Sequence, residues 1–195
     1  MRQAQRNYGP GTDRNSKMCV IISHHPNTAI NYTELDRACA TNPHGNGYII
    51  ASKGYFESGK GKSLEFIIER FKEAPQDSYR AIHARIATSG GQGTNMCHPF
   101  TSKDGRYLLM HNGVVSSDGL EGDAHQSDTS KLANYISDYL EYGRKELEEL
   151  AHVNSSRFLI LDLEGMTVEH FGKWKFTNGV WRSNLDHLNT WSTAA

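Results

Sequence analysis

The sequence has little of what membrane-spanning or nucleic-acid-binding proteins need. Its 195 residues contain no apolar run that approaches the roughly 20 residues of a membrane span. The formal net charge is -1, which creates no basic field for nucleic acid or for an anionic membrane surface. We therefore expect no membrane partner and no nucleic-acid partner.

Cysteine is also scarce. The three cysteines, Cys19, Cys39 and Cys97, cannot all pair with one another. Residues 1–17 are polar and lack the apolar stretch of a secretory signal. Without an export signal, reduced thiols are the expected state, and we expect a cytoplasmic location.

The composition indicates one globular domain with a polar extension. Residues 1–18 show no apolar periodicity and contain Gly9-Pro10-Gly11, so we interpret them as a tail, a propeptide or a mis-assigned start. Aromatic residues at 10% and charged residues at 22% are typical of an ordinary globular protein. We assign residues 19–195 to a single domain, long enough to bury about 70% of its unfolded surface.

The periodicity of apolar residues predicts strands first, then helices, then strands again. Asn178-Gly179 predicts a two-residue hairpin turn. This order favours a layered α+β fold over alternating βαβ units. The expected helices cover residues 33–40, 63–74, 128–142 and 144–152. The expected strands cover residues 19–24, 47–52, 79–88, 106–111, 157–163 and 167–171, with the hairpin over 174–183.

Four positions could carry chemistry, and each has a plainer interpretation. Cys19 opens the first strand and is either a nucleophile or a buried core cysteine. Arg85, beside His83 and a glycine-rich loop, could grip a carboxylate with two hydrogen bonds or form a surface salt bridge. Asn112-Gly113 could present two N–H donors as an oxyanion hole or form a simple turn. Asp128 could bind a ligand or simply cap a helix.

Zinc is a further possibility because histidines are frequent. Their spacings match no closed zinc site, and only Cys97-His98 brings two ligand types together. We expect no metal and no cofactor.

Taken together, the segments resemble class II glutamine amidotransferase domains of the N-terminal-nucleophile (Ntn) hydrolase superfamily. The resemblance follows the chain in order from Met18 onward and covers nearly all of it. It rests on Met18-Cys19 followed by NPHGNGYII (42–50), IHARIATSG (82–90), HPF (98–100), HNG (111–113), SDT (127–129) and RSN (182–184). It implies a four-layer αββα sandwich with two antiparallel sheets.

The resemblance also implies a role for each matching residue. Cys19 matches the nucleophile, and Asn112 with Gly113 matches the oxyanion hole. The substrate-binding positions are Arg85 for the glutamine α-carboxylate, Thr88 in support, His98 lining the pocket, and Asp128 for the α-ammonium. The implied activity is hydrolysis of the glutamine side-chain amide to glutamate and ammonia.

Two features depart from the family pattern. The family's general base is the free α-amine of a terminal cysteine, with a pKa near 7.7–8.0, whereas Cys19 follows eighteen residues. Translation could start at Met18, the extension could be cleaved, or the extension could remain and the domain be inactive. The family's histidine-threonine-arginine run also has Ala84 in its middle position.

Three hypotheses therefore remain. The chain is a glutaminase subunit that passes ammonia to a separate synthetase or acceptor enzyme, since no synthetase segment follows Ala195. Alternatively, it is a catalytically inactive binding or regulatory module, or a related cysteine amidohydrolase. The pair of Arg85 with Asp128 favours an α-amino-acid substrate over the last alternative.

Overall fold

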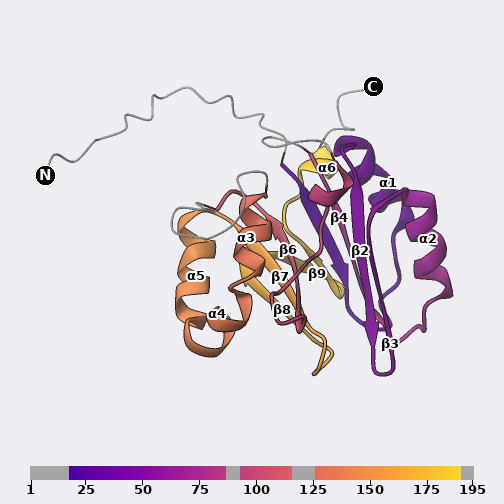
Figure 1. Ribbon diagram of the computed structural model, residues 1–195. Coiled ribbons are helices and arrows are strands. Elements are labelled where there is room, and N and C mark those ends of the chain that lie inside the picture. The colour runs from indigo at the N-terminus through magenta and orange to yellow at the C-terminus, as the bar shows by residue number, and fades with distance from the viewer. Residues whose placement is uncertain (1–17, 87–92, 116–125, 190–195) are drawn as a thin grey trace, which may run out of the picture.

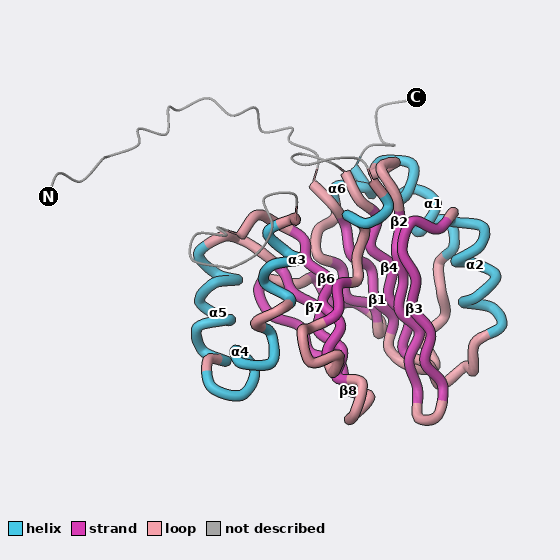
Figure 2. Tube along the Cα trace, in the orientation of Figure 1, coloured by secondary structure: helices cyan, strands magenta, loops and turns pink. Residues whose placement is uncertain are grey.

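Two antiparallel sheets and the helices that flank them make up the fold. The computed structural model describes residues 18–86, 93–115 and 126–189, and all statements below concern these residues (Figure 1). Figure 2 shows the strands gathered in the middle of the domain and the helices on its two sides. The α+β class and the two antiparallel sheets expected from the sequence are confirmed.

The first sheet carries the first strand of the chain at its centre. Within the described ranges it has six strands, in the order β3 (Tyr55–Lys62), β2 (Asn46–Ser52), β4 (Tyr79–Ala84), β1 (Val20–His24), β10 (Val180–Arg182) and β9 (Lys175–Thr177). Between β9 and β10, Asn178 and Gly179 have φ angles of 50° and 78°. Positive φ at both positions is the geometry of a type I′ turn, so the predicted hairpin is confirmed.

The second sheet is built from the middle of the chain. Among the described residues it has four strands, in the order β5 (Phe100–Thr101), β6 (Tyr107–Asn112), β7 (Arg157–Asp162) and β8 (Thr167–Gly172). The nearly continuous apolar sequence of β7 reflects burial on both faces. Leu159 faces the first sheet, while Phe158 packs under helices.

Helices cover the outer face of each sheet. On the first sheet lie α1 (Tyr32–Thr41) and α2 (Leu64–Glu73), and on the second lie α3 (Asp128–Ala133), α4 (Ile136–Tyr142) and α5 (Arg144–Val153) (Figure 1). The short helices η1 (Thr94–Met96) and α6 (Asp186–Asn189) complete the described elements. Side chains of Asn31, Ser63 and Ser127 accept backbone N–H groups and so begin α1, α2 and α3.

Three apolar clusters hold these elements together. One joins α1 and α2 to the first sheet, and a second joins α3, α4 and α5 to the second sheet. The third lies between the sheets and contains Ile21, Ile49, Ala51, Tyr79, Ala81, Leu108, Met110, Leu159 and Leu161. Each strand that separates two clusters must therefore be apolar on both faces.

Two sequence expectations need correction, and one long strand was not predicted. The helix expected over 128–142 is two helices, because Asn134 ends α3 and Tyr135, with φ -106° and ψ 1°, begins α4. The strand expected over 79–88 ends at Ala84 in the described chain. The strand β3 was not expected at all, since its two glycines and its charges hide the alternation. No helix in the described part of the chain is long and apolar enough to cross a membrane.

Candidate active site

Cys19 lies directly before β1, at one end of the central strand of the first sheet. Its Sγ is 3.4 Å from the backbone nitrogen and 3.4 Å from the backbone oxygen of Ile86. Burial raises the pKa of the Cys19 thiol, while the Ile86 backbone and the charge of Arg85 act in the opposite direction. The thiol therefore needs a nearby base before it can react as a thiolate at neutral pH.

Strand alternation turns three of the predicted site residues toward the space between the sheets. Cys19, Arg85 and Asn112 lie an even number of positions from residues of the inter-sheet cluster, and even spacing along a strand preserves the face. The reference residues are Ile21 of β1, Ala81 of β4 and Met110 of β6. Cys19 precedes β1 and Arg85 follows the antiparallel β4, so both lie at one end of the first sheet, and Asn112 at the end of β6 is linked to Ile21 there through Ser183.

Arg85 continues β4 by one residue. Its backbone N–H donates to the carbonyl of Gly45 at 2.9 Å, and its own carbonyl accepts from the backbone of His44 at 3.0 Å. The side chain is only 7% exposed. The segment around Gly45 thus holds the Arg85 backbone through both its N–H and its carbonyl. The buried guanidinium of Arg85 acts electrostatically on Cys19.

Asn112 is the last residue of β6 in the second sheet, and Gly113 follows it. The Asn112 side chain is buried, with Nδ2 at 2.8 Å from Ser183 Oγ and with Oδ1 contacting no hydrogen-bond partner among the described residues. Gly113 has φ +138°, and a Cβ there would lie 2.4 Å from Ser156 Oγ. Both the backbone angle and the close approach require glycine at this position.

Asp128 begins α3 near the same end of the second sheet. Its Oδ2 accepts the backbone N–H of Val115 at 3.0 Å, and its Oδ1 accepts that of Thr129 at 2.8 Å. Thr129 Oγ1 in turn lies 2.8 Å from His111 Nδ1 on β6. These contacts join the start of the helix to the strand that carries Asn112.

Three buried histidines lie close to the candidate site residues. His83 and His98 stack with ring centroids 4.0 Å apart, and His98 Nδ1 accepts the backbone N–H of His111 at 3.0 Å. Burial lowers the pKa of His83 to about 3 and that of His111 to about 4, and it holds the pKa of His98 well below its usual value. All three rings are therefore neutral at pH 7, and His98 supports the strand end through its hydrogen bond.

A segment near the C-terminus reaches back to the site. Ser183 exchanges hydrogen bonds with the Ile21 backbone, its N–H donating to Ile21 O at 3.0 Å and its Oγ accepting Ile21 N–H at 2.9 Å. Asn184 Nδ2 donates to the carbonyl of Cys19 at 2.7 Å. The Arg182 guanidinium binds the Glu34 carboxylate through Nε and Nη2, at 2.5 and 2.8 Å. Arg182 thus anchors this segment to Glu34, while Ser183 and Asn184 contact Ile21 and Cys19.

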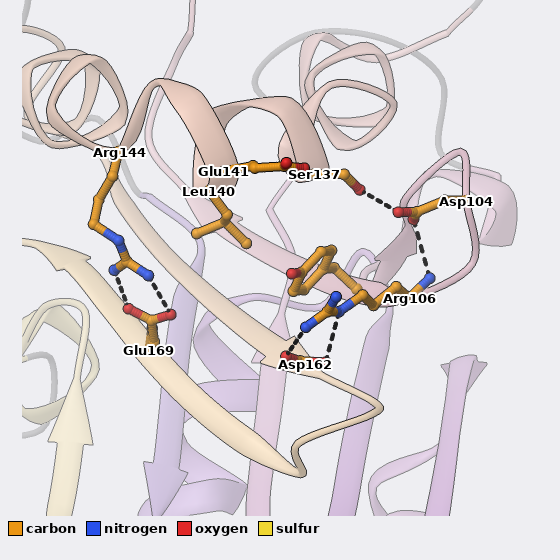
Figure 3. Close-up of a pocket in the computed structure, with 9 residues that line it drawn as sticks. Asp104, Arg106, Ser137, Leu140, Glu141, Arg144, Asp162 and Glu169 are labelled. Atoms are coloured by element: carbon orange, nitrogen blue, oxygen red, sulfur yellow. Dashed lines mark hydrogen bonds and ion pairs between the residues drawn. The ribbon is translucent and has the colours of Figure 1, made fainter.

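Two pockets lie away from this constellation. One, of about 360 Å³, lies by Arg106 and Asp162, at the end of β6 and β7 opposite Asn112 (Figure 3). Arg106 binds Asp162 there at 2.8 and 3.1 Å, and Arg144 pairs with Glu169. The second, of about 280 Å³, adjoins His25, at the opposite end of β1 from Cys19. Because its arginines already hold carboxylates, the larger pocket is a poor match for a carboxylate substrate.

The structure describes all but one of the site residues predicted from the sequence. Cys19, Arg85 and Asn112 face one inter-sheet space, Gly113 adjoins it, and Asp128 starts the nearby helix. Thr88 lies outside the described residues. Sequence reasoning gave no role to Ser183 and Asn184, although the RSN segment belonged to the resemblance. Their partners lie 71 and 165 positions away, so no local pattern reveals them.

Comparison with known proteins identifies a similar fold. No protein-family model matches the sequence, and no curated protein matches it. Among solved structures, the fold is similar to that of glutamine phosphoribosylpyrophosphate (PRPP) amidotransferase from B. subtilis complexed with ADP and GMP. The TM-score is 0.58 and the identity 19%, over 87% of this chain and 42% of that chain. The likeness concerns the fold, and at that level it agrees with the resemblance drawn from the sequence.

Proposed function

We propose that this chain is an Ntn-type glutamine amidotransferase domain, a four-layer αββα sandwich that hydrolyses the side-chain amide of glutamine. The observation that supports the proposal most is that Cys19 has two links to the other candidate residues. Arg85 acts electrostatically on Cys19, and Asn112 bonds to Ser183, which bonds to the backbone of Ile21, two residues after Cys19. The fold similarity to glutamine phosphoribosylpyrophosphate (PRPP) amidotransferase supports glutamine as the substrate.

Substrate binding requires two opposite charges at a fixed separation, because glutamine is a zwitterion. Arg85 is the proposed partner of the α-carboxylate, since a guanidinium can donate two parallel hydrogen bonds to it. Asp128 is the proposed partner of the α-ammonium, with Thr88 and His98 in supporting positions. This arrangement directs the side-chain amide toward Cys19.

The reaction then follows the chemistry of a cysteine nucleophile. The α-amine of Cys19, once it is terminal, accepts the thiol proton, and the thiolate attacks the amide carbon. Asn112 Nδ2 and the Gly113 N–H donate to the oxygen that becomes negative in the tetrahedral intermediate. As the intermediate collapses to a thioester, the amide nitrogen takes the proton back from the α-ammonium of Cys19 and leaves as ammonia. Water then cleaves the thioester, which releases glutamate and restores the thiol.

The acceptor of the ammonia is proposed to be a separate enzyme, and the reaction needs no cofactor or metal. A second candidate is a non-catalytic module that binds glutamine without turnover. The burial that raises the Cys19 pKa favours this second candidate whenever the extension remains attached, because a peptide-bonded Cys19 has no amine base.

The direct test is replacement of the nucleophile. In the form that begins at Cys19, Cys19→Ala should abolish glutamate release and covalent labelling by a diazo-ketone analogue of glutamine. Cys39→Ala, which removes a half-buried thiol from α1, is the matched control and should retain both. Labelling at Cys97, or glutamate release by Cys19→Ala, would overturn the assignment.

A further inference from the structure

We infer that Ser183 is a positioning residue that decides which end of the Asn112 amide faces the scissile carbonyl. The inference rests on the proposed function, and it gives a role to the RSN segment that the mechanism above leaves unused. Ser183 touches no substrate in this account. It acts through Asn112.

The Ser183 hydroxyl has a restricted set of hydrogen bonds. Its oxygen accepts the Ile21 N–H at 2.9 Å, and the residue is 1% exposed, so bulk water does not compete. The backbone N–H of Ser183 donates to Ile21 O at 3.0 Å, which fixes the Cα position. The hydroxyl therefore has one proton left to donate, and Asn112 is the side chain within reach at 2.8 Å.

The two orientations of the Asn112 amide are not equivalent. With Nδ2 toward Ser183, the hydroxyl oxygen accepts two N–H groups, and Oδ1 is buried without a partner among the described residues. A half-turn of the amide fills the same volume, lets Ser183 Oγ–H donate to Oδ1, and turns Nδ2 to the place that Oδ1 held. Each orientation leaves one buried group without a partner, Oδ1 in the first and Nδ2 in the second, at a cost of about 1–3 kcal/mol. A substrate oxygen that accepts from Nδ2 removes this cost only in the turned orientation, so substrate binding favours the turn.

Only the turned orientation suits the proposed chemistry. An oxygen at the oxyanion position would repel the developing negative charge, whereas an N–H donor there stabilises it. Loss of one oxyanion donor typically lowers kcat by about 10²–10³. Ser183 can select the amide orientation because its own position is fixed. Arg182 beside it is held by Glu34, which is 5% exposed and lies 3.0 Å from His187 Nε2.

The kinetic arm of the test uses the form that begins at Cys19. Ser183→Ala should lower kcat for glutamine about 10–100-fold and leave KM within about twofold, because the oxyanion forms only in the transition state. Ser183→Thr, which keeps the hydroxyl, should recover most of the loss. In an Asn112→Ala background, Ser183→Ala should have little further effect. Ser137→Ala, at the distant pocket, is the control.

The second arm does not depend on turnover. Neutron diffraction from deuterated crystals of the complex with glutamate γ-semialdehyde should show the Ser183 deuteron directed to Asn112 Oδ1 and the Nδ2 deuterons directed away, the reverse of the orientation without ligand. Glutamate γ-semialdehyde, whose carbonyl carbon bonds to Sγ while its oxygen becomes anionic, should bind Ser183→Ala at least tenfold more weakly, with glutamate affinity unchanged.

Each outcome decides the inference. Deuterons of Nδ2 pointing to Ser183 in the semialdehyde complex, or full kcat in a folded Ser183→Ala, would overturn it while leaving glutamine hydrolysis intact. If the parent form releases no glutamate, the proposed function fails. The amide orientation and the semialdehyde affinity then support or overturn the role of Ser183 on their own.

Discussion

Asn184 Nδ2 donates a 2.7 Å hydrogen bond to the carbonyl oxygen of Cys19, across 165 positions of sequence. The segment that follows β10 thereby holds the residue that precedes β1. A second bond, from the Asp186 N–H to Asn184 Oδ1 at 3.1 Å, orients the same side-chain amide. Placement of the proposed nucleophile thus depends on a residue outside its own sheet neighbours β4 and β10.

Removing this bond should loosen the nucleophile. We expect Asn184→Ala to lower kcat about tenfold and the free energy of unfolding by about 0.5–1.5 kcal/mol, the net contribution of one hydrogen bond. Steady-state glutamine hydrolysis and urea unfolding measure the two effects. Asn189→Ala, at the end of α6, serves as a control for asparagine loss in this region. Unchanged kcat in Asn184→Ala would show that Cys19 is positioned without it.

Arg85 and Asp128 should control glutamine binding rather than the chemical step. Removing one partner of a buried charge pair typically costs 2–5 kcal/mol, so Arg85→Ala or Asp128→Asn should raise KM by at least about 30-fold. Calorimetry with glutamine on the Cys19→Ala background measures the affinity directly. Arg106→Ala removes an arginine that already binds Asp162 at the distant pocket and should leave glutamine affinity unchanged. Parental affinity in both site variants would refute the pocket assignment.

Acid should destabilise the domain through its buried histidines. The pKa values of His83 and His111 fall from 6.5 to about 3 and about 4 on folding, and that of His98 falls as well. Between pH 6.5 and 4 the unfolded chain therefore binds more protons, so their contribution to stability is complete above pH 6.5 and is lost as pH falls. The loss approaches about 1.4 kcal/mol per pH unit for each group.

Urea unfolding at several pH values tests this expectation. His83→Gln should reduce the slope of the unfolding free energy against pH by the equivalent of close to one bound proton. His152→Gln replaces an exposed histidine on α5 and should leave the slope unchanged. Equal slopes in the parent and in His83→Gln would mean that His83 is not buried neutral.

Gly113 offers a test of the backbone beside the proposed oxyanion position. Gly113→Ala combines a strained φ of +138° with a clash against Ser156 Oγ at 2.4 Å, whereas Gly105 has φ +79° and open space around it. Gly113→Ala should therefore destabilise the fold by about 1–3 kcal/mol more than Gly105→Ala, the usual range for overpacking. Thermal and urea unfolding of the two variants give the difference. Equal losses would mean that the strand end moves away from Ser156.

Local chemistry explains what the sequence could reveal about the fold. The Asn178-Gly179 turn and the apolar stripe of α2 are encoded within a few residues, and both were predicted. The break between α3 and α4 was missed because the apolar stripe continues across Asn134 and Tyr135. The strand β3 forms through pairing with β2, which outweighs the weak strand propensity of its glycines.

The candidate site was likewise predictable only in part. Cys19, Arg85 and Asn112 came from motifs, and strand alternation could bring them to one face once the sheet order was known. The order itself, with β10 beside β1, joins the ends of the chain and leaves no local signal. The contacts of Ser183 and Asn184 follow from that pairing, so they had to be observed.

The central claim is that Cys19 hydrolyses glutamine with its own α-amine as the base. The measurement that tests it most directly is the glutaminase rate of two forms, one beginning at Met18 and processed to Cys19, the other retaining residues 1–18. Mass spectrometry of each sample verifies its N-terminus. The processed form should be faster by about 10²–10⁴, the usual contribution of a positioned base. Equal rates from the processed form and a verified uncut chain would contradict the free-amine mechanism.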